Sequence, residues 1–136
     1  EFRRVLFRSE DAGAQDTLDG KSIQPEIVSV IHYINTHYQE NITLDAAAGL
    51  VHMSRYHFCR LFGSATGATF LEYLYNVRLS KVHQLLLDTR LPLSQIAEKC
   101  GFTSTAHLSR VFRDAYGVSP REFRKSAAEK EPPEQQ

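Results

Sequence analysis

The chain has 136 residues, which suffices for one compact domain or for two very small ones that share a core. Its 16 Lys and Arg balance 16 Asp and Glu, and no apolar run is long enough for a signal peptide or a membrane span. The two cysteines, Cys59 and Cys100, lie 41 positions apart without paired neighbours, which excludes a zinc framework and a disulfide scaffold and favours a reducing cytoplasm.

The first 24 residues are unlike the rest of the chain. VLFRS is what the end of a DNA-sequencing adaptor would encode, so we interpret EFRRVLFRS at 1–9 as an adaptor-derived scar; a short basic amphipathic arm is the alternative. Residues 10–24 are rich in Asp, Gly, Gln and Ser, which is typical of a flexible linker. Because the only methionine is Met53, we expect the chain to be a piece of a longer polypeptide that has lost its N-terminus.

Residues 25–126 show helical spacing of apolar residues and no alternating strand pattern, which predicts an all-α fold. The predicted helices cover 25–38, 44–51, 54–66, 69–88, 93–100 and 104–116, and a seventh begins at 119–120. This body carries 11 Lys and Arg against 8 Asp and Glu, a net charge of +3 that is compatible with a polyanionic partner. Residues 127–136, AAEKEPPEQQ, contain two prolines and little apolar surface, which predicts a disordered tail.

An internal repeat is the most informative feature. HFCRLFGSATG at 57–67 and HLSRVFRDAYG at 107–117 place His, Arg, Phe and Gly in the same slots, 50 positions apart. The preceding helices match at an offset of 49, so the second turn contains one additional residue. Two tight helix pairs of this kind predict a doubled helix-turn-helix, with subdomains at 25–68 and 89–126 joined by a long linker helix at 69–88.

The second helix of each pair has two distinct faces. On a helical wheel the apolar residues form one face in each copy: Phe58, Leu61, Phe62 and Ala65 in the first, and Leu108, Val111, Phe112 and Ala115 in the second. The opposite faces carry an arginine among small, hydroxyl or aromatic groups and no carboxylate: Tyr56, Cys59, Arg60 and Gly63, then Ala106, Ser109, Arg110 and Arg113. This composition favours contact with a DNA major groove over a solvated surface.

The linker helix carries two apolar stripes, so it is expected to hold one helix pair on each side. The first stripe is Leu71, Leu74, Tyr75, Leu79, Val82, Leu85 and Leu86, and the second is Phe70, Tyr73 and Val77. Twenty residues at 1.5 Å span about 30 Å, close to the ~34 Å between successive major-groove faces, and DNA bending would supply any shortfall. Arg78 falls inside the first stripe and is predicted to pair with a carboxylate as a structural residue.

Two segments of the chain resemble the DNA-binding domain of the AraC/XylS family of bacterial transcription regulators. The matching segments are IAEKCGFTSTAHLSRVFRDAYGVSPREFR at 96–124 and ITLDAAAGLVHMSRYHFCRLFGSATGATFLEYLYNVRL at 42–79. The resemblance implies two helix-turn-helix subdomains that each place their second helix in the major groove of an asymmetric double-stranded DNA site. It also implies a cytoplasmic, nucleoid-associated activator that recruits RNA polymerase. Most family members place an effector-binding or dimerisation domain before this one, and a free-standing single-domain regulator is the alternative. No cofactor or metal is expected, because no metal-ligand spacing occurs in the sequence.

The family's contact residues can be carried over by position. The implied base-facing residues are Tyr56, Cys59, Arg60, Thr105, Ala106, Ser109 and Arg110. The implied phosphate contacts are Ser54, Arg55, Ser104, Arg113 and Arg121; Ser54 and Ser104 also stand where helix N-caps are needed. Two departures stand out: His52 occupies the turn position that is Gly101 in the second copy, and Cys59, Gly63 and Ala106 are short where many members carry long polar groups.

Two other classes of function compete with a DNA-binding regulator. A thiol enzyme could use His57 and Cys59, but these residues lie about 200° apart on a helix and cannot meet, and no phosphate loop or metal spacing occurs, so we predict that the chain is not an enzyme. A helical protein-interaction module without DNA binding is the remaining alternative. A DNA-binding regulator binds duplex DNA with an affinity that depends steeply on salt, whereas a protein-interaction module does not.

Overall fold

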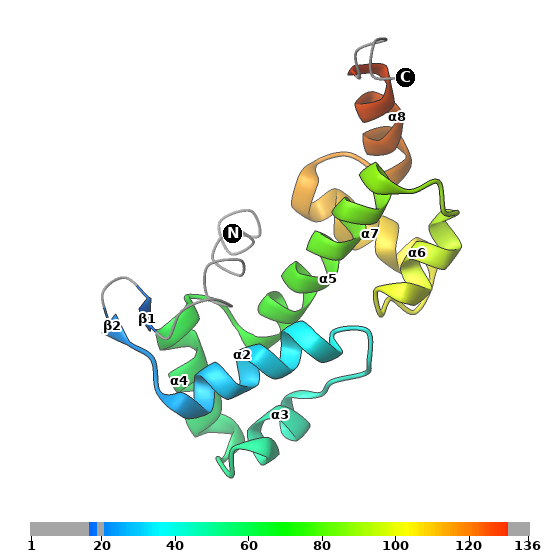
Figure 1. The fold of residues 1–136 in the computed structure, drawn as a ribbon. Coiled ribbons are helices and arrows are strands. Elements are labelled where there is room, and N and C mark those ends of the chain that lie inside the picture. Colours follow the sequence, from blue (N-terminus) through cyan, green and yellow to red (C-terminus); the bar gives the residue numbers. More distant parts are fainter. Residues whose placement is uncertain (1–16, 19–20, 131–136) are drawn as a thin grey trace. The chain divides into compact units, whose positions relative to one another are not determined.

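The computed structural model describes residues 17–18 and 21–130, and the all-α fold predicted for residues 25–126 is confirmed (Figure 1). The seven helices of this part are α2 (Pro25–His37), α3 (Leu44–Leu50), α4 (Arg55–Thr66), α5 (Phe70–Asp88), α6 (Leu93–Lys99), α7 (Thr105–Tyr116) and α8 (Pro120–Lys130). The proposed scar lies outside the described residues, as does most of the proposed linker. Among these helices, none combines the length and the apolar character that a membrane crossing requires.

Two segments differ from their predictions. Strands β1 (Thr17–Leu18) and β2 (Lys21–Ser22) pair antiparallel inside the stretch predicted to be a linker, with Thr17 opposite Ser22. Helix α8 continues through Lys130, so the predicted disorder is wrong for 127–130. Ala, Glu and Lys are strong helix formers and extend the helix to Lys130. The prolines at 132 and 133, which disfavour a helix interior, follow two residues later.

The described chain forms two compact units, and the boundary falls inside α5, between Arg78 and Leu79. Helix α5 therefore divides along its length: its first half belongs to unit 1 and its second half to unit 2. The burial pattern of α5 departs from the two predicted stripes at two positions. Leu71, placed in the first stripe, is 55% exposed, whereas Asn76, in neither stripe, is buried.

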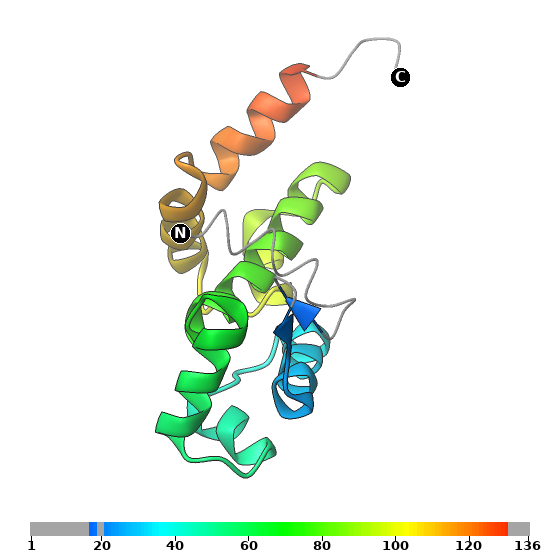
Figure 2. The same cartoon turned by 90° about the vertical axis from the view of Figure 1, so that its left-hand side faces the viewer.

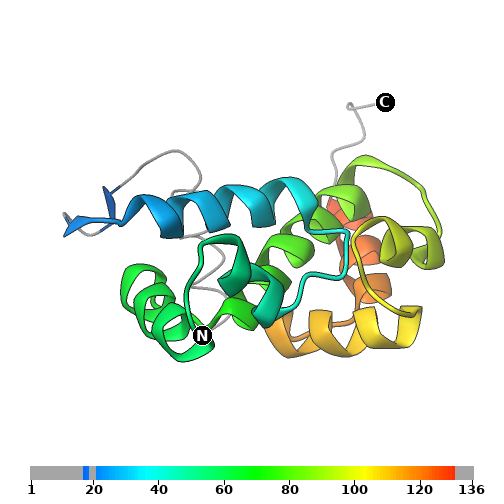
Figure 3. The same cartoon turned by 90° about the horizontal axis from the view of Figure 1, so that it is seen from below.

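The core of unit 1 is built around aromatic rings. Phe62 contacts Tyr73 edge-on with ring centroids 5.5 Å apart, and Phe58 and Phe70 complete the group. Helix α2 packs against α4 (Figure 3) and adds a buried apolar face of Ile27, Val30, Ile31 and Ile34.

Arg78 fixes the end of α2 within this unit. It is buried and donates through Nε to the carbonyl of Tyr38 at 2.7 Å and through Nη2 to the carbonyl of Glu40 at 2.8 Å. Carbonyls at a helix C-terminus lack intrahelical partners and attract a cation, which explains why these two donors go to backbone acceptors.

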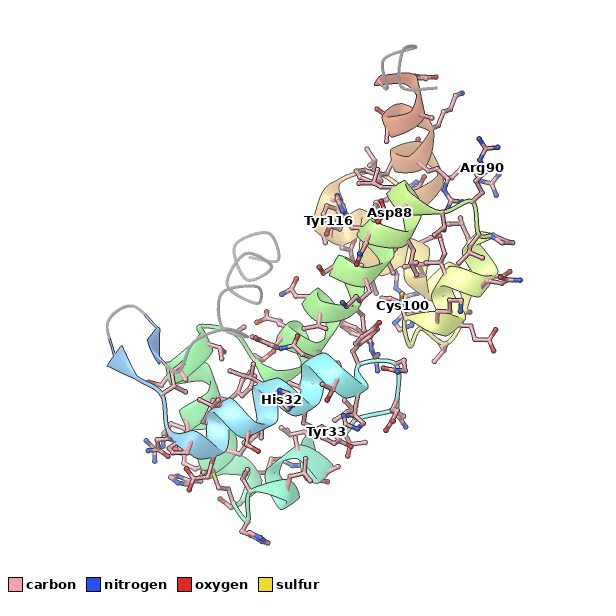
Figure 4. The ribbon with its side chains drawn as sticks, in the orientation of Figure 1. His32, Tyr33, Asp88, Arg90, Cys100 and Tyr116 are labelled. Carbon is pink, nitrogen blue, oxygen red and sulfur yellow. The ribbon has the colours of Figure 1, made fainter. Side chains whose placement is uncertain are left out.

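Unit 2 repeats the aromatic contact. Helix α7 packs against both α6 and α8 (Figures 1 and 2), and Phe112 meets Phe123 with centroids 5.7 Å apart, at the same offset of 50 from Phe62 and Tyr73. Tyr116 lies beside the part of α5 that carries Asp88 (Figure 4), with its ring 5.8 Å from that of His83. Arg124 donates to carbonyls in the last turn of α5 and in the segment that follows it, including that of Leu91 at 2.8 Å. Both units therefore use a buried or half-buried arginine to cap a helix.

Both helix-turn-helix turns bend through one residue with a left-handed backbone. His52 has φ 58° and Gly101 has φ 90°. The amide after each donates to the same helical position, Met53 to the Ala48 carbonyl and Phe102 to the Ala97 carbonyl. The turns comprise residues 51–54 and 100–104, so the predicted additional residue in the second is confirmed, although the first is about two residues longer than predicted.

Substitution at these two turn positions should separate backbone strain from side-chain effects. Gly101→Ala is expected to lower the free energy of unfolding by about 1–2 kcal/mol, because an L side chain is strained in a left-handed conformation. His52→Gly should leave stability within about 1 kcal/mol of the wild type, since relief of strain is offset by the greater flexibility of unfolded glycine. Urea denaturation measures both, and a large loss in His52→Gly would show that the imidazole itself holds the turn.

Candidate nucleic-acid interface

The candidate interface consists of the outward faces of α4 and α7. On α4, Tyr56 is 76% exposed, and Cys59 and Arg60 are exposed as well. The Nη2 atom of Arg60 lies 3.3 Å from Nδ1 of His57, one turn earlier. The opposite side is fixed by Phe58 and Phe62, which are fully buried. Packing of the apolar face therefore leaves these three predicted base-facing residues on the solvent side of unit 1.

Helix α7 presents the corresponding side of unit 2. Ala106 and Arg110 are exposed, and Thr105 and Ser109 are half-buried. Arg113 and Asp114 come next along the helix, and both are exposed. Asp114 therefore limits the carboxylate-free face to the first nine residues of the helix. The prediction that this face carries no carboxylate is therefore wrong at Asp114, which lies about 40° from Arg110 around the helix axis.

The first turns of both helices are capped as predicted. The Ser54 hydroxyl accepts from the His57 amide at 3.1 Å, and the Ser104 hydroxyl accepts from the His107 amide at 3.0 Å. Each hydroxyl keeps its own proton and can donate it to an anion. The helix dipole adds a partial positive charge at these ends, so they are also suited to a phosphate group.

A second pair of caps begins α5 and α8. Thr69 with Glu72, and Ser119 with Glu122, exchange side-chain and backbone hydrogen bonds of 3.0–3.1 Å. The hydrogen bond from the Ser119 amide, followed by that from its hydroxyl, lowers the pKa of Glu122. Arg121 is exposed in the first turn of α8, next to this cap.

Arg55 differs from the other predicted phosphate contacts because a carboxylate holds it. Its Nε donates to Asp45 Oδ1 at 2.9 Å, and its Nη2 lies 2.7 Å from both Asp45 oxygens. The two side chains are 63% and 69% exposed. Hydrogen bonding to Asp45, and then its negative charge, raise the pKa of Arg55. Sequence reasoning missed this pair, since its members lie ten positions apart on different helices.

A hollow of about 330 Å³ lies beside the outward face of α4. Its lining includes Cys59, Gly63, Gly67 and Thr69. A side chain at Gly63 would meet nothing within 4 Å. The short residues Cys59 and Gly63 therefore leave open space on this face. Arg55, Tyr56 and Arg60 are the α4 side chains long enough to extend from the face toward a ligand.

Comparison with known proteins identifies the same helix-turn-helix fold in other proteins. A family model described as a helix-turn-helix domain matches residues 47–126. The probable transcriptional regulator LumQ of Photobacterium leiognathi is 34% identical over 71% of this chain, which spans 39% of LumQ's length. The C-terminal domain of AraT, a response regulator from Geobacillus stearothermophilus, is 30% identical with a TM-score of 0.74, covering 76% of this chain and 87% of that one.

A third relative was solved with DNA. The DNA-binding domain of AdpA, a global transcriptional factor in complex with a target DNA, is 28% identical with a TM-score of 0.77, covering 81% of this chain and 99% of that one. The fold and the two outward helix faces thus define a helix-turn-helix DNA-binding domain. The chain belongs to the AraC/XylS family of DNA-binding transcriptional regulators. This family is a class of regulators and not of enzymes.

Proposed function

We propose that this chain binds a specific double-stranded DNA site by inserting α4 and α7 into successive segments of the major groove. The observation that carries the proposal is the repeated outward face, on which Arg60 and Arg110 stand exposed at equivalent positions of the two units. An arginine fork matches the two acceptors of guanine, and nearby methyl and hydroxyl groups suit thymine and variable contacts.

The remaining side chains on these faces have distinct roles in the proposal. Tyr56, Cys59, Thr105, Ala106 and Ser109 face the bases, with the short ones forming only close or apolar contacts. The capped helix starts at Ser54 and Ser104, together with Arg113 and Arg121, bind phosphates and set the register. Each of these residues is exposed or half-buried.

The proposal extends to the protein of which this domain is a part. We expect an activator that recruits RNA polymerase and acts on the bacterial nucleoid in the cytoplasm. Because the chain spans 39% of LumQ and 32% of the xylose operon regulatory protein of Escherichia coli, an effector-binding or dimerisation domain would occupy the remaining length in proteins of that kind.

Duplex binding over a range of salt concentrations tests the proposal. A duplex enriched from a random pool should bind with an affinity that falls steeply as salt rises, because contacts to phosphates release counterions. Arg113→Ala should weaken all duplexes alike and reduce the slope of log K against log salt by about 0.9. Fluorescence anisotropy with enriched and scrambled duplexes measures both quantities.

The competing module makes the opposite prediction. Equal affinity for every duplex, or no binding at low salt, would favour a helical protein-interaction domain that has lost DNA recognition. DNA binding is favoured over that module by the exposed arginines of the outward faces, Arg60 on α4 and Arg110 and Arg113 on α7.

A further inference from the structure

The Arg55–Asp45 pair joins the two helices of the first helix-turn-helix. Asp45 stands in the first turn of α3, and Arg55 is the first residue of α4. The edge of the guanidinium formed by Nε and Nη2 faces the carboxylate, with three nitrogen–oxygen distances of 2.7–2.9 Å. Two hydrogen-bonding points fix the plane of the guanidinium, which a single contact would leave free to rotate.

The other edge of the same guanidinium is free for a ligand. Arginine has five N–H donors, and the edge formed by Nη1 and Nη2 points away from Asp45 with two parallel donors. No hydrogen bond links Nη1 to any of the described residues. A planar fork with two parallel donors is the complement of the O6 and N7 acceptors of guanine in the major groove.

The position of Arg55 suits a base edge. The first residues of a recognition helix are those that contact bases in helix-turn-helix complexes. Arg55 and Cys59 are one turn apart on the same side of α4, and Cys59 is exposed.

The charge of the pair argues against a phosphate contact. Asp45 cancels the charge of Arg55, so a phosphate at this place would gain little attraction and would lie close to a carboxylate. A guanine edge is neutral and carries only acceptors, so it meets no such repulsion. The pair therefore suits a directional contact to a base rather than a charge contact to the backbone.

Resting on the proposed function, we propose that Arg55, oriented by Asp45, is a specificity-determining residue that reads one guanine through its Nη1–Nη2 edge. This changes the role of Arg55 from the phosphate contact that the family resemblance implies. The second unit has Ser94 and Thr105 at the matching positions and cannot form such a pair. The contact therefore belongs to α4 alone and makes the target site asymmetric.

The test compares variants on duplexes that the wild-type chain enriches from a random pool. Arg55→Ala should lower affinity for the enriched duplex roughly tenfold, with the loss confined to one G·C pair, and it should match the wild type on a duplex in which that pair is replaced. Arg55→Lys should not restore the preference, because an ammonium lacks the planar fork. Asp45→Asn should weaken the preference for this pair while raising affinity for scrambled duplexes, since it removes a negative charge from the interface.

Controls separate this inference from the proposed function. Arg113→Ala should weaken every duplex alike, whereas a wild type without sequence preference would contradict the proposed function itself. If the wild type keeps its preference but Arg55→Ala lowers all affinities equally and reduces the salt slope by about 0.9, Arg55 is a phosphate contact and the inference is wrong. An unchanged base profile in Asp45→Asn would overturn the orienting role. Thermal melting verifies folding, and the two conservative variants keep the test valid if Arg55→Ala does not fold.

Discussion

Phe112→Ala is expected to lower the free energy of unfolding by about 3–5 kcal/mol, and Phe62→Ala by a similar amount. Both rings are fully buried. Phe112 contacts the ring of Phe123 in unit 2, and Phe62 contacts the ring of Tyr73 in unit 1. Truncation leaves a cavity whose walls cannot collapse completely. A loss of this size is comparable with the whole stability of a small unit, so partial unfolding at room temperature is expected.

Leu71→Ala provides the matched control, because the apolar pattern of α5 predicts burial there and the structure shows exposure. At 55% exposed, Leu71 should cost less than about 1 kcal/mol when truncated. Urea denaturation followed by circular dichroism measures all three variants. Equal losses at positions 71 and 112 would contradict the assignment of the core, and a separate transition in Phe62→Ala would show that the two units unfold independently.

The second large effect concerns recognition. Arg60→Ala and Arg110→Ala should each weaken binding to the enriched duplex by about 1–3 kcal/mol, and each should relax the preference at one base position. The arginines stand at the same place in the repeat, are exposed, and lie opposite the buried rings of their own helices. Competition binding against duplexes with single base-pair changes measures the loss position by position.

Lys81→Ala is a suitable control for these variants, since Lys81 lies on α5 and outside both outward helix faces. It should leave the base preferences unchanged. If Arg60→Ala or Arg110→Ala weakened all duplexes by one common factor, its arginine would contact the phosphate backbone, and base reading would have to come from shorter neighbours such as Ser109.

Much of the fold could be predicted because the helix signals are local. The wheel positions of Phe62 and Phe112, and the serines at 54 and 104, depend on spacing within one turn or two, and the structure confirms their burial and their capping bonds. Local patterns of this kind survive folding because tertiary contacts reinforce them.

The remaining features depend on contacts between distant segments. The acceptors of Arg78 lie about 40 positions away at the end of α2, and Arg55 finds Asp45 on another helix. An apolar stripe indicates which side of α5 can be buried but not where one core ends and the next begins. Leu71 was consequently predicted to be buried and Asn76 was overlooked.

Selection of bound duplexes from a random pool, carried out in parallel with the wild type, Arg60→Ala and Arg110→Ala, tests the central claim most directly. If α4 and α7 each read their own segment of the major groove, the two variants will lose preference at different base positions, separated by about one helical turn of roughly 10 base pairs. Loss at the same position in both variants, or an unchanged profile in either, would contradict recognition by two helices.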